Sequence, residues 1–316
     1  MNKSKKHIIL TLILIISMIV GCESESVSEK TSTTADTKIN VLSTTTMLND
    51  MATIIGGDKV HAVSLLATAV DPHTYQATAL DVEKMNNADV ILYNGFNLEA
   101  KLESVILNLE SQGKNIICVE NALDADDILY DAEEQDAIDP HVWNDISLWI
   151  KVSMHVAESL SNIDPTNSDI YNANAENFVN ELYELEEYVI NRTLEISEEK
   201  RIIVSAHDAF GYLGNAYGYT VAGLQGINTE VEASTLDVIL LADFIVENNV
   251  PAIFTESAIN IKTLEALQEA VKSRGFDVIL VEKPLYSDYL GDETTDTETY
   301  IKTFKHNIDS IVDALK

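Results

Sequence analysis

The chain has 316 residues, and its 52 acidic side chains far outnumber its 20 lysines and arginines, which leaves a formal net charge of −32 at pH 7. Such a charge repels nucleic acid and anionic lipid head groups, so the sequence excludes a nucleic-acid partner. The two cysteines, Cys22 and Cys118, are too few for a disulfide framework, and Cys118 lies in an apolar run that predicts a buried thiol.

Residues 1–21 have the organisation of an export signal. Three lysines precede an apolar run over residues 8–20, and Gly21 and Cys22 follow this run. The run is shorter than the ~20 residues that a membrane-spanning helix needs, which argues against a transmembrane anchor.

Residues 19–22 resemble a bacterial lipobox, in which Cys22 is lipidated and becomes the mature N-terminus. The acyl chains would then hold the protein on the outer face of the cell membrane. Residues 22–37 are rich in Ser, Thr and Glu, and they predict a solvated tether between this anchor and the folded protein.

Residues 38–164 alternate between short β-branched runs and longer stretches with helical periodicity. Strands are predicted at 39–43, 60–66, 90–93 and 116–119, and helices at about 46–56, 77–87 and 98–112. Because strands that alternate with helices are joined by right-handed crossovers, this segment predicts a parallel sheet with flanking helices.

Residues 165–199 contain no glycine and no proline after Pro165, and they predict one unbroken helix of roughly 50 Å. Asp164 is a suitable N-cap, and Pro165 suits the first helical position. One face is acidic, and the opposite face carries an apolar stripe. The stripe consists of Tyr171, Ala175, Phe178, Leu182, Leu185, Val189 and Ile196. This length favours a strut between two bodies over an ordinary surface helix within one domain.

Residues 200–316 repeat the alternation of the first segment. Strands are predicted at 202–205, 220–223, 252–255 and 278–281, and helices at about 208–217, 234–248, 260–274 and 297–314. The chain is therefore predicted to be an α/β protein with two lobes, residues 38–164 and 200–316. Each lobe has a four-stranded, mainly parallel sheet flanked by helices and enough elements for its own core, and one rigid backbone helix, residues 165–199, joins them.

Four loops at the predicted strand ends contain a possible metal ligand, and ligands of open parallel sheets bind beyond the carboxyl ends of the strands. Two loops carry Asp-Pro-His, at residues 71–73 and 139–141, and the others carry His207 and Asp288. Proline restricts its own backbone and that of the preceding residue. Each imidazole is therefore carried by a stiff backbone segment, which suits a preorganised metal ligand. A single loop histidine is usually a surface residue, but three at matching strand ends predict a metal site.

Other polar residues have weaker assignments. Asp71 and Asp139 can act as hydrogen-bond partners of the imidazole rings, and Glu256 can do the same or make a structural hydrogen bond. Asp208 follows His207 and can equally compensate a helix N-terminus. The residues expected to be surface, structural or packing residues are His61, His155, His306, Trp143 and Trp149.

These motifs resemble those of the solute-binding lipoproteins of zinc and manganese ABC importers, the TroA-like family with a helical backbone between its lobes. The resemblance runs through residues 38–316 and rests on several motifs in the family's order and approximate spacing. The motifs are the segments Thr44–Met51, Asp71–Leu80, Asn87–Leu98, Asp139–Trp143, Val204–Gly218, Leu224–Glu232, Ile253–Ser257 and Tyr286–Gly291.

The resemblance implies a clamshell that holds one metal ion between its lobes, with two ligands from each. His73 and His141 match the family's first two ligands, and Asp288 matches its last. His207 matches the third ligand, which is histidine or glutamate depending on the branch. The resemblance also implies a non-enzymatic monomer that moves little on binding, captures metal outside the cytoplasm and delivers it to the permease subunit of an ABC transporter.

The choice of metal follows from the ligand types. Three imidazoles and a carboxylate suit Zn²⁺, which binds N and O ligands more tightly than Mn²⁺ does. The resemblance also associates a histidine third ligand with zinc, yet many zinc-specific members have a histidine-rich loop, and residues 124–139 here are acidic and contain no histidine. This acidic segment is expected to be a solvated, mobile loop. We therefore expect Zn²⁺ first and Mn²⁺ as the alternative, with an affinity that falls below roughly pH 6 as the imidazoles become protonated.

Two functions of other classes are compatible with parts of the pattern. A zinc hydrolase needs an open coordination position for water, which three histidines alone would leave, but a fourth protein ligand closes it and no His-Glu-x-x-His motif occurs. The other alternative is a surface adhesin, a role sometimes proposed for lipoproteins of this kind. A nucleotide-binding role is disfavoured, since the chain contains neither a phosphate loop nor a dinucleotide fingerprint.

Overall fold

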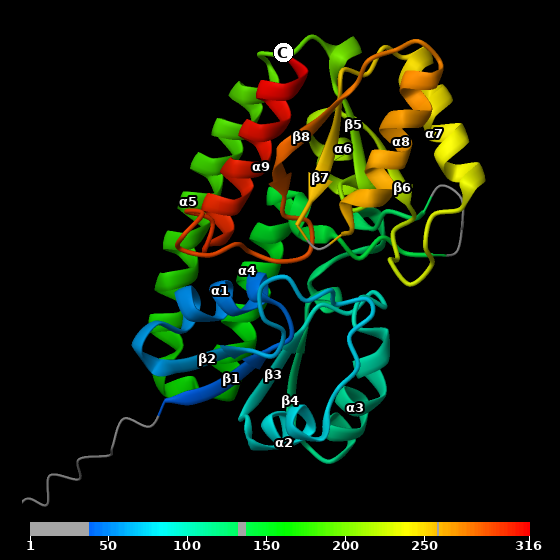
Figure 1. Cartoon of the computed structure of the whole chain (residues 1–316). Helices are drawn as coiled ribbons and strands as arrows, with labels where there is room; N and C mark the ends of the chain where they lie inside the picture. The colour runs from blue at the N-terminus through cyan, green and yellow to red at the C-terminus, as the bar shows by residue number, and fades with distance from the viewer. Residues whose placement is uncertain (1–37, 132–136, 258) are drawn as a thin grey trace, which may run out of the picture. The chain divides into compact units, whose positions relative to one another are not determined.

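A parallel sheet with the strand order β2-β1-β3-β4 lies in the middle of the N-terminal lobe in the computed structural model, which describes residues 38–131, 137–257 and 259–316 (Figure 1). The strands are β1 (Ile39–Ser43), β2 (Val60–Ser64), β3 (Val90–Tyr93) and β4 (Asn115–Cys118). Each neighbouring pair is parallel, with Val41 opposite both Ala62 and Val90. The predicted parallel sheet of this lobe is confirmed.

The two faces of this sheet are covered by α1 (Thr46–Gly56), α2 (Ala79–Asn87) and α3 (Ala100–Ser111). Successive strand residues point to opposite faces, which decides the core that each one joins. Val41 packs in the core that contains α1, whereas Leu42 packs in a separate core with residues of α2 and α3. Thr78 begins α2 through a reciprocal capping box with Asp81.

Helix α4 (Ile146–Ile163) was not among the predicted helices, although its apolar residues recur at helical spacing. Asp145 begins the helix by accepting hydrogen bonds from the backbone N–H groups of Ser147 and Leu148. Its buried face belongs to the same core as the backbone helix, against which it packs. The backbone helix therefore has a second long helix packed along it.

The backbone helix α5 (Ser168–Thr193) is shorter than the predicted 165–199, and a 3₁₀ turn precedes it. Its 26 residues span roughly 39 Å. The chain leaves the helix early because it turns and brings Ile196 back into the core. Asp164 does not cap the helix with its side chain; instead it accepts hydrogen bonds from the side chains of Asn167 and Tyr171. The predicted apolar stripe is buried throughout.

The C-terminal lobe contains β5 (Ile202–His207), β6 (Thr220–Gln225), β7 (Ala252–Glu256) and β8 (Ile279–Leu285). Within the described residues these strands form two parallel pairs, β5-β6 and β7-β8, rather than the continuous four-stranded ladder that was predicted. Strands β5 and β7 still lie side by side (Figure 1). At their carboxyl ends the backbone N–H of His207 bonds to the Glu256 carboxylate, so a side chain takes the place of a ladder bond there.

The helices of this lobe are α6 (Gly211–Tyr217), α7 (Thr235–Glu247), α8 (Ile261–Ser273) and α9 (Tyr300–Leu315). Helices α7 and α8 pack against each other over one face of the strands, and α9 packs against α5 on the other (Figure 1). Short 3₁₀ segments lie at Gly57–Lys59, Val119–Ala122, Ala125–Asp127, Val142–Asn144, Pro165–Asn167 and Glu198–Lys200.

One hydrophobic core extends through both lobes. It joins Met51 of α1 and Trp149 of α4 with Leu182 of α5 and Phe304 of α9. Smaller separate cores lie under α2 and α3 in one lobe and under α7 and α8 in the other. Each lobe was predicted to have its own core, but the largest core is shared. Separation of the lobes would therefore expose apolar surface to water.

Membrane attachment was predicted for the N-terminal segment alone. The export signal, the lipidated Cys22 and the tether all lie outside the described residues. Within the described ranges, no helix is both long enough and apolar enough to cross a membrane.

Candidate metal centre

Four side chains from four separate segments converge at one buried point. His73 comes from the loop after β2, His141 from the loop before α4, His207 from the end of β5 and Asp288 from the loop after β8. One possible ligand atom from each lies within 4.8 Å of those of the others. Two of the side chains belong to each lobe, so the centre lies between the lobes. The sequence analysis placed this same set at matching strand ends.

The converging atoms are buried without ordinary partners. The exposed fraction is 2% for His73, 0% for His141 and His207, and 3% for Asp288. Within the described residues, neither the three imidazole Nε2 atoms nor Asp288 Oδ1 has a hydrogen-bond partner. Buried polar atoms are almost always paired, so a group of nitrogen and oxygen atoms that face one another without hydrogen-bond partners indicates a missing ligand.

The Asp288 carboxylate lies near all three rings. Its oxygens are 3.4 Å from the Nε2 atoms of His141 and His207 and 3.9 Å from that of His73. The ring centroids are 5.3 to 6.0 Å apart, and the ring planes are tilted or perpendicular to one another. The rings therefore do not stack, and their nitrogen atoms point towards a common centre.

His141 is oriented by the first residue of its own Asp-Pro-His segment. Asp139 Oδ1 accepts hydrogen bonds from both the backbone N–H and the ring Nδ1–H of His141, at 3.0 and 2.7 Å. Because the carboxylate can only accept, Nδ1 carries a proton, and Nε2 is the ring atom that can bind a metal. The Asn94 side chain donates to the Pro140 carbonyl at 3.0 Å and holds the segment from the sheet side.

His207 is oriented by a carboxylate from the neighbouring strand. Glu256 Oε2 accepts from the ring Nδ1–H at 2.6 Å, and Glu256 Oε1 accepts from the backbone N–H at 3.0 Å. The pair is fully buried. The two expected roles of Glu256, as a partner of the site and as a structural hydrogen-bond acceptor, are thus combined in one carboxylate.

Asp71 differs from Asp139 although the two tripeptides are identical. Asp71 Oδ1 accepts from the backbone N–H of His73 at 2.8 Å, and Oδ2 accepts from the hydroxyl of Thr229 in the other lobe at 2.6 Å. The expected bond from an imidazole ring to Asp71 is not among the contacts of the described residues. Asp71 therefore fixes the backbone of the His73 segment and links it to the C-terminal lobe.

The segment that carries Asp288 is held by residues of the N-terminal lobe. The indole N–H of Trp143 donates to the Ser287 carbonyl at 2.7 Å, and the Trp143 ring packs edge-on against His141. The backbone N–H of Leu290 donates to Thr46 at 2.8 Å. Trp143, expected to be a packing residue, thus connects the His141 ring with the segment that carries Asp288; its place two residues after His141 was the signal for this role in the sequence.

The pKa values of the three imidazoles differ because their electrostatic surroundings differ. Burial lowers the pKa of His73 to about 4, against the attraction of Asp288. Burial also opposes protonation of His141, but the charge and hydrogen bond of Asp139 raise its pKa to about 9. Burial opposes protonation of His207 as well, but the negative charges of Glu256 and Asp288 raise its pKa well above the usual value. His207, His141 and His73 together hold the pKa of Asp288 well below its usual value, despite its burial.

The remaining expectations concern residues near the centre or near the acidic segment. Asp208 is half-buried beside His207, its Oδ1 atom has no hydrogen-bond partner within the described residues, and desolvation raises its pKa to about 6. In the acidic segment, the Asp127 carboxylate is bound by Lys151 at 2.6 Å, so that end of the segment is held. Residues 132–136 of the predicted loop lie outside the described residues.

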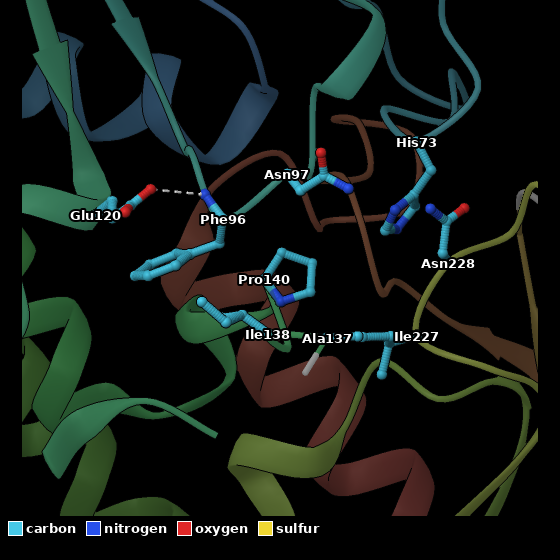
Figure 2. Close-up of a pocket in the computed structure, with 9 residues that line it drawn as sticks. All are labelled: His73, Phe96, Asn97, Glu120, Ala137, Ile138, Pro140, Ile227 and Asn228. Atoms are coloured by element: carbon cyan, nitrogen blue, oxygen red, sulfur yellow. Dashed lines mark hydrogen bonds between the residues drawn. The ribbon is translucent and has the colours of Figure 1, made fainter. Parts of the chain in front are cut away.

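A cavity of about 410 Å³ adjoins the centre on the side of His73 (Figure 2). It lies between the lobes, because its walls come from both. The lining residues are His73, Phe96, Asn97, Glu120, Ala137, Ile138, Pro140, Ile227 and Asn228. The cavity was not predicted, because its walls are distant in the sequence.

Comparisons with known proteins identify the family to which the chain belongs. The family model described as "Zinc-uptake complex component A periplasmic", ZnuA, matches residues 41–314. The chain is 36% identical to the manganese-binding lipoprotein MntA of Bacillus subtilis (strain 168), over 94% of this chain and 95% of that protein. It is 41% identical to the zinc-binding protein TroA of Treponema pallidum (strain Nichols), over 89% of this chain and 90% of that protein.

The solved structures show the same fold. The structure of the periplasmic zinc-binding protein TroA from Treponema pallidum superposes with a TM-score of 0.84 at 40% sequence identity, covering 88% of this chain and 99% of that one. The match includes the long backbone helix and both lobes, which confirms the predicted fold class. The chain therefore belongs to the ZnuA family of metal-binding components of uptake complexes.

Proposed function

We propose that this protein captures one divalent metal ion outside the cytoplasm and delivers it to the permease of an ABC importer. The ion would be bound by the Nε2 atoms of His73, His141 and His207 and by the Asp288 carboxylate. The observation that supports this assignment best is the convergence of four buried atoms that have no hydrogen-bond partner within the described residues. Neutral imidazoles and a carboxylate are ligands that Zn²⁺ and Mn²⁺ both accept.

We propose Zn²⁺ as the preferred ion and Mn²⁺ as the alternative. Three nitrogen ligands and one oxygen ligand suit the tetrahedral preference of Zn²⁺ and its stronger binding to nitrogen. The names of the relatives do not favour one metal, since one relative is named as zinc-binding and another as manganese-binding. The Nδ1–H bonds from His141 and His207 to carboxylates raise the basicity of both rings, which favours tight binding of either ion.

The transport context follows from the family. Relatives carry the names "Manganese ABC transporter substrate-binding lipoprotein PsaA" and "Manganese-binding lipoprotein MntA". For this chain we propose a lipid on Cys22, a solvated tether over residues 22–37, a monomeric state and docking on a permease subunit. We also propose that the protein functions as two lobes, residues 38–164 and 200–316, which are joined by the linking segment 165–199.

The two alternative functions find no support in the site or in the relatives. A hydrolase needs a metal position that is open to water, whereas the proposed ligand set has four protein side chains. The family is described as a component of a zinc-uptake complex and its relatives are named as metal-binding or substrate-binding proteins, so the expectation of a non-enzymatic protein is confirmed by family membership. No contact or surface among the described residues specifically favours an adhesin.

The deciding experiment measures metal content and competition. The protein without residues 1–22 should contain about one metal ion per chain after reconstitution with zinc, and zinc should displace manganese in a competition assay. His207→Ala should lose or strongly weaken binding, whereas His61→Ala, a change of an exposed histidine in β2, should not. Far-UV circular dichroism would verify that both variants are folded. A wild-type protein that takes up no stoichiometric metal would refute the proposal.

A further inference from the structure

The cavity beside His73 connects the protein surface with the metal centre. Asn97 on its wall is exposed to solvent, whereas His73 on the same wall is only 2% exposed. Among the described residues that line the cavity, His73 is the one member of the proposed ligand set. An ion that crosses the cavity from solvent therefore reaches His73 before the other three ligands.

The size and lining of the cavity suit a divalent ion that keeps its water. About six first-shell water molecules occupy roughly 180 Å³ at about 30 Å³ each, which is less than half of the cavity. The amide groups of Asn97 and Asn228 face the cavity on the side of the His73 ring and can accept hydrogen bonds from such water (Figure 2). The net charge of −32 of the whole chain favours the approach of cations over that of anions.

The wall that carries Asn97 has an unusual backbone. Gly95, Phe96 and Asn97 have φ values of 80°, 52° and 63°, so three successive residues are left-handed. This conformation is unfavourable for phenylalanine, and the Glu120 carboxylate stabilises it by accepting the Phe96 backbone N–H at 3.1 Å. Backbone strain of this kind is often retained where a side chain must be placed for function, and here it places Asn97 on the cavity wall.

One loop of the C-terminal lobe closes the cavity and is fastened to the N-terminal lobe. This segment, residues 226–231, is called the clasp loop; it supplies Ile227 and Asn228 to the cavity wall. Its Thr229 hydroxyl donates to Asp71 at 2.6 Å, and its Glu230 pairs with Lys101 of α3 at 2.5 Å. At the far end, the Val231 carbonyl accepts a hydrogen bond from Gln225, the last residue of β6. The loop is therefore anchored in one lobe and attached to the other by two polar contacts.

We propose that the cavity is the path by which the hydrated cation enters and leaves, and that the clasp loop opens and closes this path. The inference rests on the proposed metal-binding function. Asp71 couples the loop to the first ligand, because the carboxylate that holds Thr229 also holds the backbone N–H of His73. Opening of the clasp loop would thus free the cavity mouth and loosen the segment that carries His73 in one movement.

The proposal is tested by the rates of metal exchange, measured by stopped-flow mixing with a fluorescent chelator. Ile227→Trp fills the cavity, so the association and dissociation rates of zinc should both fall by about tenfold. The dissociation constant should stay within about twofold, because only the path and not the bound state is changed. Thr229→Val removes one clasp contact and should raise the dissociation rate by about fivefold, the effect of losing one hydrogen bond. Ile261→Trp makes the same substitution on an exposed residue of α8 and should change neither rate.

Two outcomes would overturn the proposal. Unchanged exchange rates in Ile227→Trp would show that the ion takes another route. A weaker equilibrium affinity with an unchanged association rate would show that Ile227 shapes the bound state and not the path. If Ile227→Trp does not fold, Ile227→Phe repeats the test with a smaller side chain. A wild-type protein without stoichiometric zinc would instead refute the proposed function, so the two failures are distinguishable.

Discussion

At the scale of single residues, the three imidazoles of the centre differ in protonation although they are expected to bind the same ion. His73 has its pKa lowered to about 4 by burial and is neutral near pH 7. Burial is outweighed at His141 by Asp139, which raises the pKa to about 9, and at His207 by Glu256 and Asp288. In the metal-free protein His141 and His207 therefore carry a second proton, on Nε2, near pH 7, and a metal ion must displace it.

We therefore predict that zinc affinity continues to rise between about pH 7 and pH 9, the pKa region of His141. This window lies above the fall below roughly pH 6 expected from ordinary imidazoles. Titration calorimetry in buffers of different ionisation enthalpy should show more than one proton released per zinc near pH 7. Asp139→Asn should lower the pKa of His141 and reduce this release. Zero proton release near pH 7 in the wild type would contradict the prediction.

The stability of the metal-free protein has the opposite pH dependence. A folded-state pKa raised above the unfolded value stabilises the fold fully below about pH 6.5, and this stabilisation is lost as the pH rises through the folded-state value. For His141 that value is about 9. The metal-free protein should thus lose stability over the same pH range in which its affinity for metal increases.

Another prediction concerns Glu256, because two donors face its two oxygens. The ring and the backbone N–H of His207 each bind one oxygen, so glutamine would place an NH₂ group against an N–H group. Glu256→Gln should weaken zinc binding by about 100-fold, the upper end of effects for such outer partners of metal ligands. Competition with a chelator of known affinity measures the change. Glu265→Gln, on the exposed face of α8, is the control and should bind like the wild type.

At the scale of elements, the position of His207 depends on how closely β5 and β6 approach each other. A Cβ atom on Gly223 of β6 would lie 2.3 Å from the backbone nitrogen of Asp208 and 2.6 Å from the Gln225 carbonyl oxygen. Both neighbours are backbone atoms, so they can give way only if the strand end moves. His207 precedes Asp208 directly and would move with it.

We predict that Gly223→Ala lowers the free energy of unfolding by about 1–3 kcal/mol, the usual effect of overpacking, and also weakens zinc binding. Gly226→Ala, three residues further on, adds a Cβ with open space around it and should change stability by less than about 0.5 kcal/mol. Urea denaturation and zinc competition measure the two effects. Equal stability of the two variants would show that β6 can move away without disturbing the centre.

At the scale of the whole folded region, the shared core decides how far the lobes can move. Helices α4, α5 and α9 belong to one core with the sheet of the N-terminal lobe. Asp50 of α1 adds a polar link, since its carboxylate accepts the backbone N–H of Tyr300 at the start of α9 at 2.9 Å. Opening by a wide hinge would break these contacts, so exchange of the ion is expected to use local movement of loops instead.

We therefore predict that zinc changes the distance between the lobes by no more than about 2 Å, the scale of small shear movements. Spin labels on exposed Glu103 of α3 and Glu265 of α8 would report this distance by pulsed electron resonance. A label on Val231, an exposed residue of the clasp loop whose side chain makes neither clasp contact, should shift relative to Glu103 by more than the lobe pair does. A large change between Glu103 and Glu265 would show that the shared core does not restrain the lobes.

The sequence by itself determined the α/β class, the parallel sheet of the N-terminal lobe and the four side chains that converge. These features depend on local signals, which are β-branched runs, helical periodicity, and histidines at strand ends, two of which directly follow a rigid Asp-Pro pair. The length of α5 was overestimated because residues 194–199 contain no glycine or proline. In the structure the helix ends at Thr193, and Ile196 beyond it packs in the shared core, a contact that the local sequence does not specify.

Only the tertiary structure decided how the site is held and reached. Identical Asp-Pro-His tripeptides differ because Asp139 meets a ring nitrogen of His141, whereas Asp71 meets the backbone of His73 and Thr229 of the other lobe. The interrupted ladder between β5 and β7, the shared core and the cavity also join residues that are far apart in the chain. Local sequence patterns record which face of an element is apolar or which loop carries a ligand. Local patterns do not predict which distant residue will contact that face or that ligand, because the packing of the whole chain decides such contacts.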